Sequence, residues 1–261
     1  PPGAGKSTFI EEFGSILTKK GNKVAVLAID PSSKKSQGSI LGDKTRMTNL
    51  ANDKNAFVRP TSARDILGGI SENTKESIIL CEAAGFNIIL VETVGVGQSE
   101  SHISNIVDFC LLLTITGAGD ELQTIKRGLI ELADTIIITK ADGDNIDNAK
   151  KLSIQYQNTL NRIKNNGWEI PVTICSSHNK IGLNNIWGII KDYIKKMTVK
   201  NFILKNRKRQ DIAYLHMLIK KEFGERKYIK IKEKVLKRAE KEILGDKKNV
   251  YRILEEIEKA T

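Results

Sequence analysis

Residues 1–8, PPGAGKST, decide the fold of this chain. They fit the end of the phosphate-binding pattern G-x-x-x-x-G-K-[ST], with Gly5, Lys6 and Ser7 in its last three places. The first glycine of that pattern would stand just before Pro1, so we expect the strand that leads into such a loop to lie outside this sequence. The pattern predicts a P-loop protein that binds a nucleoside triphosphate.

Each residue type in the loop suits contact with phosphate. Glycines let the backbone turn its N–H groups inward, toward phosphate oxygens, and the helix that follows adds its positive end. The loop itself consists of Gly3, Ala4 and Gly5. At the start of the helix, Lys6 is expected at the β- and γ-phosphates, Ser7 at Mg²⁺ and Thr8 at the α-phosphate.

Apolar runs alternate with amphipathic stretches along the first 200 residues, which indicates an α/β fold with a mostly parallel sheet flanked by helices. A helical stripe follows the loop at residues 9–17. Further helices are predicted at 71–84, 121–132, 145–164 and 184–197. Strands are predicted at 23–29, 87–92, 109–115, 135–139 and 171–175.

The pattern changes after residue 200, where no strand signal remains. Three apolar stripes at helical spacing occupy residues 212–223, 231–243 and 250–257. Such stripes need a surface to bury against. We expect them to pack on the sheet domain or on the same tail of a second subunit. The predicted domains are a P-loop domain at 1–198 and a helical arm at 199–261.

Composition is ordinary for a globular protein, with 40% hydrophobic and 28% charged residues among 261. The three cysteines, Cys81, Cys110 and Cys175, lie in apolar stretches, which favours buried thiols over disulfides. Of the net charge of +11, +8 falls on residues 201–261, where 18 basic side chains face 10 acidic ones. Because the acids are interspersed and aromatics are sparse, we interpret this tail as a solvated helical face rather than a nucleic-acid or membrane surface.

The run IILVETVG at residues 88–95 delivers an acid to the end of a predicted strand. Ligands of open α/β sheets bind at that edge, so Glu92 is expected to hold Mg²⁺ directly or through water. Gly95 can donate its N–H to the γ-phosphate, and the polar stretch after it suits a γ-phosphate sensor. Within that stretch Gln98 is a candidate for orienting water, and equally a plain loop residue.

The run TKAD at residues 139–142 directly follows another predicted strand and is similar to the [NT]-K-x-D guanine motif. A carboxylate at Asp142 can accept from both the N1–H and the exocyclic N2–H of guanine, whereas adenine offers no matching donors. Lys140 would lie along the base, and Thr139 stands where asparagine is commoner. Ser176 and Ser177, after the last predicted strand, are expected to cover the base from the other side.

Two more acids could reach the metal. Asp30 ends the first predicted strand, and Asp43 lies in a polar segment after it. Mg²⁺ takes six oxygens and keeps several waters, so Ser7, Asp30, Asp43 and Glu92 are more than direct coordination requires. Asp43 could instead cap a helix.

Five strings together resemble the MeaB/ArgK family of P-loop GTPases, which chaperone adenosylcobalamin-dependent methylmalonyl-CoA mutase. They are AIDPSS (28–33), GSILGDKTRM (38–47), LCEAAGF (80–86), VETVGVGQSE (91–100) and GAGDELQ (117–123). The resemblance is continuous from Pro1 to about Asn145 and looser beyond. The family has a helical segment and a strand before the P-loop, which this sequence does not include.

The resemblance implies that residues 1–198 form a GTPase domain, which binds GTP or GDP with Mg²⁺ and hydrolyses GTP, and that residues 199–261 form the dimerisation arm of a homodimer. It also implies that the protein gates adenosylcobalamin loading and protects a cobalamin-dependent acyl-CoA mutase. It implies that Lys6, Glu92, Gln98 and Arg46 serve catalysis, with Arg46 in a first switch. It also implies that Asp120 and Lys126 belong to a loop that communicates with the mutase. The implied compartment is a bacterial cytoplasm or, in a eukaryote, the mitochondrial matrix.

Three other functions stay open from the sequence. An ATP-dependent kinase linked to amino-acid transport is disfavoured by Asp142. A nickel-insertion GTPase would need clustered Cys and His, whereas His102, His178 and His216 are scattered. A nucleic-acid-binding module would require steeply salt-dependent binding through the tail.

Overall fold

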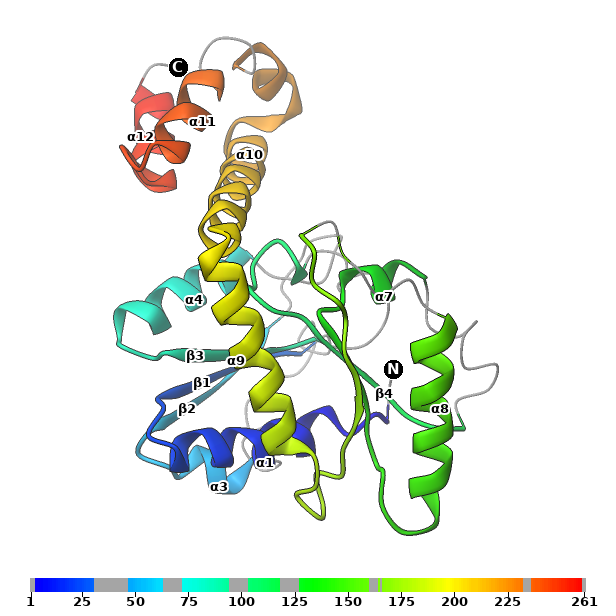
Figure 1. Cartoon of the computed structure of the whole chain (residues 1–261). Helices are drawn as coiled ribbons and strands as arrows, with labels where there is room; N and C mark the ends of the chain where they lie inside the picture. The colour runs from blue at the N-terminus through cyan, green and yellow to red at the C-terminus, as the bar shows by residue number, and fades with distance from the viewer. Residues whose placement is uncertain are drawn as a thin grey trace. The chain divides into compact units, whose positions relative to one another are not determined.

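A computed structural model of the chain describes residues 3–30, 47–62, 72–93, 103–117, 127–159, 164, 166–231 and 236–259. The chain divides into two compact units, Pro1–Asp192 and Tyr193–Thr261. Figure 1 shows the helices and strands of both units, and each unit has its own apolar core.

The first unit contains two three-stranded sheets whose strands all pair in parallel. One sheet has the order β2-β1-β3 and the other the order β4-β5-β6. The strands of the first are β1 (Val24–Asp30), β2 (Ala56–Ser62) and β3 (Ile88–Glu92), and those of the second are β4 (Leu111–Thr114), β5 (Thr135–Ile138) and β6 (Val172–Ile174). Among these strands no pairing joins β3 to β4. The predicted α/β fold with parallel strands flanked by helices is confirmed.

Strand β1 is apolar from Val24 to Ile29 because helices cover both faces of its sheet. Val24 and Val26 pack in a core with residues of α1 (Lys6–Lys19) and the first turns of α9 (Leu183–Val199). Ala25 and Leu27 point the other way, into a cluster with Cys81 of α4 (Glu72–Ala83). Alternate residues of β1 thus pack into the cores on the two opposite faces of the sheet, which is the burial expected of a central parallel strand.

The sequence analysis missed strand β2 and the short helix α3 (Thr48–Ala51). The run of β2 is interrupted by Arg59 and Pro60, which hides its strand character. Proline cannot donate to a ladder and is tolerated on edge strands. Strand β2 pairs only with β1 among the described strands, so it is an edge strand of the kind that accepts Pro60.

Three further elements complete the first unit. They are α7 (Arg127–Leu132), a short 3-10 turn η1 (Gly143–Asn145) and α8 (Ile146–Thr159). Helix α7 covers the last part of the predicted helix 121–132, whose first residues lie outside the described part. Helix α8 covers residues 146–159 of the helix predicted at 145–164. Lys164 is not helical, since its N–H donates to the carbonyl oxygen of Trp168 at 2.9 Å.

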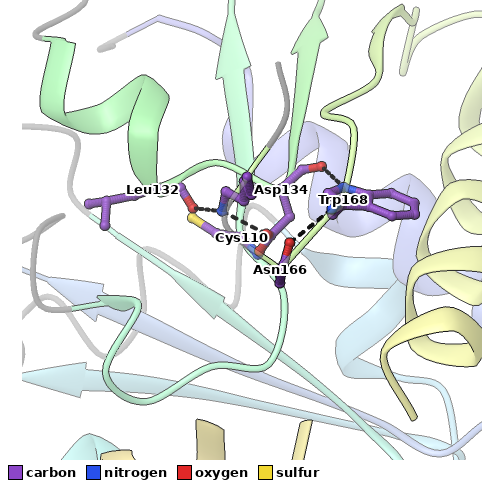
Figure 2. A network of polar contacts seen from close by, with 6 residues as sticks. Cys110, Leu132, Asp134, Asn166 and Trp168 are labelled. Atoms are coloured by element: carbon purple, nitrogen blue, oxygen red, sulfur yellow. Dashed lines mark hydrogen bonds and ion pairs between the residues drawn. The ribbon is translucent and has the colours of Figure 1, made fainter. Parts of the chain in front are cut away.

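A buried polar network lies at the amino-terminal edge of the second sheet (Figure 2). The Asp134 carboxylate accepts from the Cys110 N–H at 2.9 Å and pairs with the Lys164 ammonium at 2.7 Å. Lys164 also donates to the Leu132 carbonyl at 3.1 Å, and the Trp168 indole N–H donates to the Asp134 carbonyl at 2.8 Å. Burial raises the pKa of Asp134 above its usual range, although the Lys164 charge acts in the opposite direction.

The second unit contains α10 (Phe202–Ile231), α11 (Lys237–Leu244) and α12 (Val250–Lys259). Gly224, at φ 76° and ψ 160°, interrupts α10 with a conformation that suits glycine alone. The apolar stripes of the three helices meet in one core, which includes Leu215, Ile219, Ile243 and Ile253. The three stripes therefore bury against one another within this unit, and their use in a dimer stays a prediction. No helix in the described ranges is long and apolar enough to cross a membrane.

Candidate nucleotide-binding site

The predicted phosphate loop leads directly into α1. Gly3 and Gly5 have φ of 78° and 70°, in the left-handed region that favours glycine. The Gly5 carbonyl accepts the first helical bond, from the Phe9 N–H at 2.8 Å, so the helix begins at Lys6. The backbone N–H groups of the first turn of α1 have no intrahelical partner, and the helix dipole is positive there. This geometry suits an anion.

Two of the predicted magnesium ligands lie in contact. The Ser7 hydroxyl donates to the Glu92 carboxylate at 3.0 Å, across 85 residues of sequence. Ser7 comes from the first turn of α1 and Glu92 from the carboxyl end of β3. A hydroxyl and a carboxylate side by side fit the oxygen set that Mg²⁺ takes alongside water and phosphate. In the described ranges no group of three or more His, Cys, Asp or Glu side chains forms a metal site.

Seven predicted site residues lie partly or wholly outside the residues that the structure describes. The backbone of Asp30 ends β1 opposite Ser62, but its side chain lies outside the described part. Six other predicted site residues lie wholly outside the described part: Asp43, Arg46, Gly95, Gln98, Asp120 and Lys126.

Thr139 has a different contact from the one expected of a base-recognising residue. Its side chain is buried, and its hydroxyl lies 2.8 Å from the Ala4 carbonyl oxygen and 3.0 Å from the Thr114 carbonyl oxygen. One hydroxyl hydrogen serves these two acceptors. Thr139 therefore joins the end of β5 to the P-loop backbone and to the end of β4. The short side chain of threonine suffices for this contact, because the Ala4 carbonyl oxygen of the P-loop lies within 2.8 Å of the Thr139 hydroxyl.

Asp142 is held by the segment that follows β6. The Ser176 hydroxyl donates to Asp142 Oδ2 and accepts from the Asn179 N–H at 3.0 Å, and the Ala141 N–H donates to the Cys175 carbonyl at 3.0 Å. Asp142 is half-buried, and its Oδ1 accepts no hydrogen bond from the described residues. The carboxylate is thus oriented while part of its accepting capacity stays available.

The turn that carries Ser176 is fixed at both ends. Ser176 and Ile181 exchange backbone hydrogen bonds at 3.0 and 3.1 Å, and Ser177 lies half-buried inside this turn. A Cβ at Gly182 would stand 2.5 Å from a backbone carbonyl oxygen, so only glycine fits there. Lys180 pairs with Glu12 of α1 at 2.9 Å, a contact that sequence reasoning did not anticipate because no local pattern marks it.

Cys175, between β6 and this turn, is a buried thiol as the sequence analysis predicted. Burial raises its pKa to about 12, and the negative charge of Asp142 acts in the same direction. At neutral pH the group is therefore a neutral thiol and a poor nucleophile. We assign it a packing role beneath the Asp142 loop.

These residues gather at the carboxyl ends of β3, β4, β5 and the segment after β6, which is where open parallel sheets bind ligands. A phosphate loop lies at one end of the arrangement, and a carboxylate suited to guanine lies at the other. That layout defines the class of P-loop GTPases.

Comparison with known proteins gives the family. A sequence model described as "Methylmalonyl Co-A mutase-associated GTPase MeaB" matches residues 1–232, so the chain belongs to the MeaB family. The chain is 47% identical over 216 residues to a protein named GTPase ArgK of Escherichia coli (strain K12), covering 82% of this chain and 65% of that protein. It is 44% identical over 221 residues to "Methylmalonic aciduria type A homolog, mitochondrial" of Mus musculus, covering 84% and 53%. The chain thus spans between about half and two-thirds of the length of these relatives.

A solved structure supports the same fold. The chain resembles the crystal structure titled LAO/AO transport system kinase with a TM-score of 0.68 and 32% sequence identity. The match covers 99% of this chain and 78% of that one.

Proposed function

We propose that this protein binds and hydrolyses GTP, gates adenosylcobalamin loading and protects a cobalamin-dependent acyl-CoA mutase, with methylmalonyl-CoA mutase as the client. The observation that carries the GTPase part is the oriented carboxylate of Asp142, in contact with the Ser176 hydroxyl. The mutase part is supported by membership of the MeaB family and by the name of the mouse relative.

Asp142 supplies the preference for guanine. Each carboxylate oxygen can accept more than one hydrogen bond, so Asp142 can keep the Ser176 bond and still accept from guanine N1–H and N2–H. Adenine would leave these acceptors without donors, and a buried acceptor left unpaired costs binding free energy. This argues against an ATP-dependent kinase, the alternative suggested by the name of the solved structure.

The phosphate end is formed by the P-loop and the first turn of α1. Lys6 supplies a positive charge to the β- and γ-phosphates, and Ser7 with Glu92 would hold Mg²⁺. When bound, the metal ion supplies positive charge against the phosphates. Thr139 fixes the P-loop backbone at Ala4, so the loop meets phosphate in a set conformation. Water orientation by Gln98 and charge stabilisation by Arg46 complete the proposal for hydrolysis.

The partner contacts are proposed on the family relationship alone. Asp120 and Lys126 would respond to the mutase, and two copies of the chain would form a homodimer through residues 199–261. Light scattering on the purified protein at several concentrations tests the dimer. A mass of one chain at every concentration would refute it.

The decisive experiment is GTP turnover by the purified protein with and without methylmalonyl-CoA mutase, with ATP as the competitor. We expect turnover of GTP that excess ATP does not inhibit and that the mutase accelerates. Inhibition by ATP would refute guanine selection by Asp142. GTP turnover that is unchanged by the mutase would support the GTPase activity and refute methylmalonyl-CoA mutase as the client.

A further inference from the structure

The loop after β5 contains a residue in a backbone conformation that side chains rarely adopt. Lys140 has φ of 56°, in the left-handed region, and its side chain is exposed. Residues other than glycine adopt this region only at a cost in free energy, which surrounding contacts must offset. The residue lies two positions before Asp142, so its conformation sets where that carboxylate points.

The Asn145 side chain provides such a contact. Its amide nitrogen donates to the Lys140 carbonyl oxygen at 2.7 Å, and its amide oxygen accepts from the Thr116 hydroxyl at 2.6 Å. The Asn145 backbone N–H also donates to the Asp142 carbonyl oxygen, at 3.0 Å. Both ends of one half-buried amide are thus used, and the loop is closed on either side of Asp142.

The second bond of this amide reaches a different strand. Thr116 follows β4, two residues after its last residue, Thr114, whose carbonyl oxygen already binds Thr139. The base-recognising loop is therefore attached to the end of β4 at two points, through Thr139 and through Asn145. An amide suits position 145 because its N–H₂ can donate to the Lys140 carbonyl oxygen while its oxygen accepts from the Thr116 hydroxyl.

We propose that Asn145 is a positioning residue for guanine recognition. It holds the Lys140 backbone in the left-handed conformation, so that Asp142 stays where a base can bind, and it ties this loop to the end of β4 through Thr116. The inference rests on the proposed function, because it takes a guanine base as the ligand of Asp142.

The proposal predicts a defect confined to the base. Without the amide, Lys140 relaxes toward a common backbone conformation and Asp142 moves with it. GDP and GTP lose affinity equally, because the phosphates bind elsewhere, and the preference for GDP over ADP falls. The KM for GTP rises while kcat stays unchanged, which a general loss of folding stability would not produce.

The test measures release of a fluorescent GDP analogue by stopped flow, with ADP competition for the base preference. We expect release about 10-fold faster in Asn145→Ala and about 3-fold faster in Thr116→Val, in line with the loss of two hydrogen bonds or one. Thr116→Ser restores the hydroxyl and the slow release. The control Asn158→Ala, at an exposed position of α8, leaves both readouts unchanged.

The double variant tests the link to β4. If Asn145 acts through Thr116, adding Thr116→Val to Asn145→Ala changes release no further, and a fully additive effect would overturn the link. Release and base preference within twofold of the unaltered protein in Asn145→Ala would overturn the positioning role. An unaltered protein that binds GDP no better than ADP would instead refute the proposed function itself, so the two failures are distinguishable.

Discussion

Strand β5 has an aspartate near each end, and the two differ in how fully their oxygens are bound. Asp134, just before the strand, has a side chain 9% exposed, with a cation and a backbone N–H on its carboxylate. Asp142, four residues after the strand, is half-buried and accepts one hydroxyl bond, on one oxygen, from the residues that the structure describes. The comparison teaches that a buried acid bound on both oxygens maintains the fold, whereas an oriented acid with one oxygen unbound by the described residues is available to a ligand.

The largest expected effect tests the structural end of β5. Lys164→Met leaves the Asp134 carboxylate buried without its cation, and breaking a buried pair in this way costs about 3 kcal/mol of unfolding free energy. Urea denaturation measures the loss. Lys150→Met is the matched control, because its pair with Asp147 spans 3.6 Å on the surface and contributes under about 1 kcal/mol. Equal losses of unfolding free energy in the two variants would show that the buried Asp134–Lys164 pair stabilises the fold no more than the surface pair does.

The next effect concerns the ligand end. In Asp142→Asn the amide N–H₂ opposes the guanine N–H donors, so GTP affinity falls about 100-fold while stability changes little. Xanthosine triphosphate, which carries a carbonyl oxygen at the base C2, gains affinity relative to GTP. Calorimetry with both nucleotides measures the change. Asp144→Asn, an exposed neighbour, is the control, and a drop in GTP affinity of similar size there would contradict the assignment.

A smaller effect sharpens the role of orientation. Ser176→Ala removes the hydroxyl that donates to Asp142 and accepts from Asn179, and we expect GDP affinity to fall about 5- to 10-fold. Fluorescent nucleotide titration measures the loss. Ser15→Ala on α1 is the control. Unchanged affinity in Ser176→Ala would mean that Asp142 needs no orienting partner.

The smallest expected effect is that of Cys175 on the free energy of unfolding, which is negligible at neutral pH and appears only in alkaline solution. The pKa of Cys175 is raised from its ordinary 9.0 to about 12 in the folded protein, so the unfolded thiol ionises first as pH rises. Stability that is present below pH 9 is therefore lost between pH 9 and 12, by about 1 kcal/mol between pH 8 and 10. Urea midpoints of the unaltered protein and of Cys175→Ala measure this difference. Parallel pH profiles would show that Cys175 does not contribute.

The sequence predicted the parts of the site whose signals are local. The P-loop glycines occupy left-handed positions, and Glu92 stands at a strand end beside Ser7, as the motifs indicated. Strand β1 was predictable because burial on both faces makes its run apolar. By contrast, Asn145, Lys180 and the Asp134–Lys164 pair act through contacts between segments far apart in the chain, which leave no periodic pattern.

The glycine that interrupts α10 has a consequence for assembly. With alanine at position 224, φ near 76° would be strained, and the helix would tend to run on straight. The apolar stripe before residue 224 could then no longer meet α11 and α12 of its own chain, and those helices would find the same stripe on another copy. We therefore expect glycine at position 224 to favour a self-contained helical unit over a domain-swapped one.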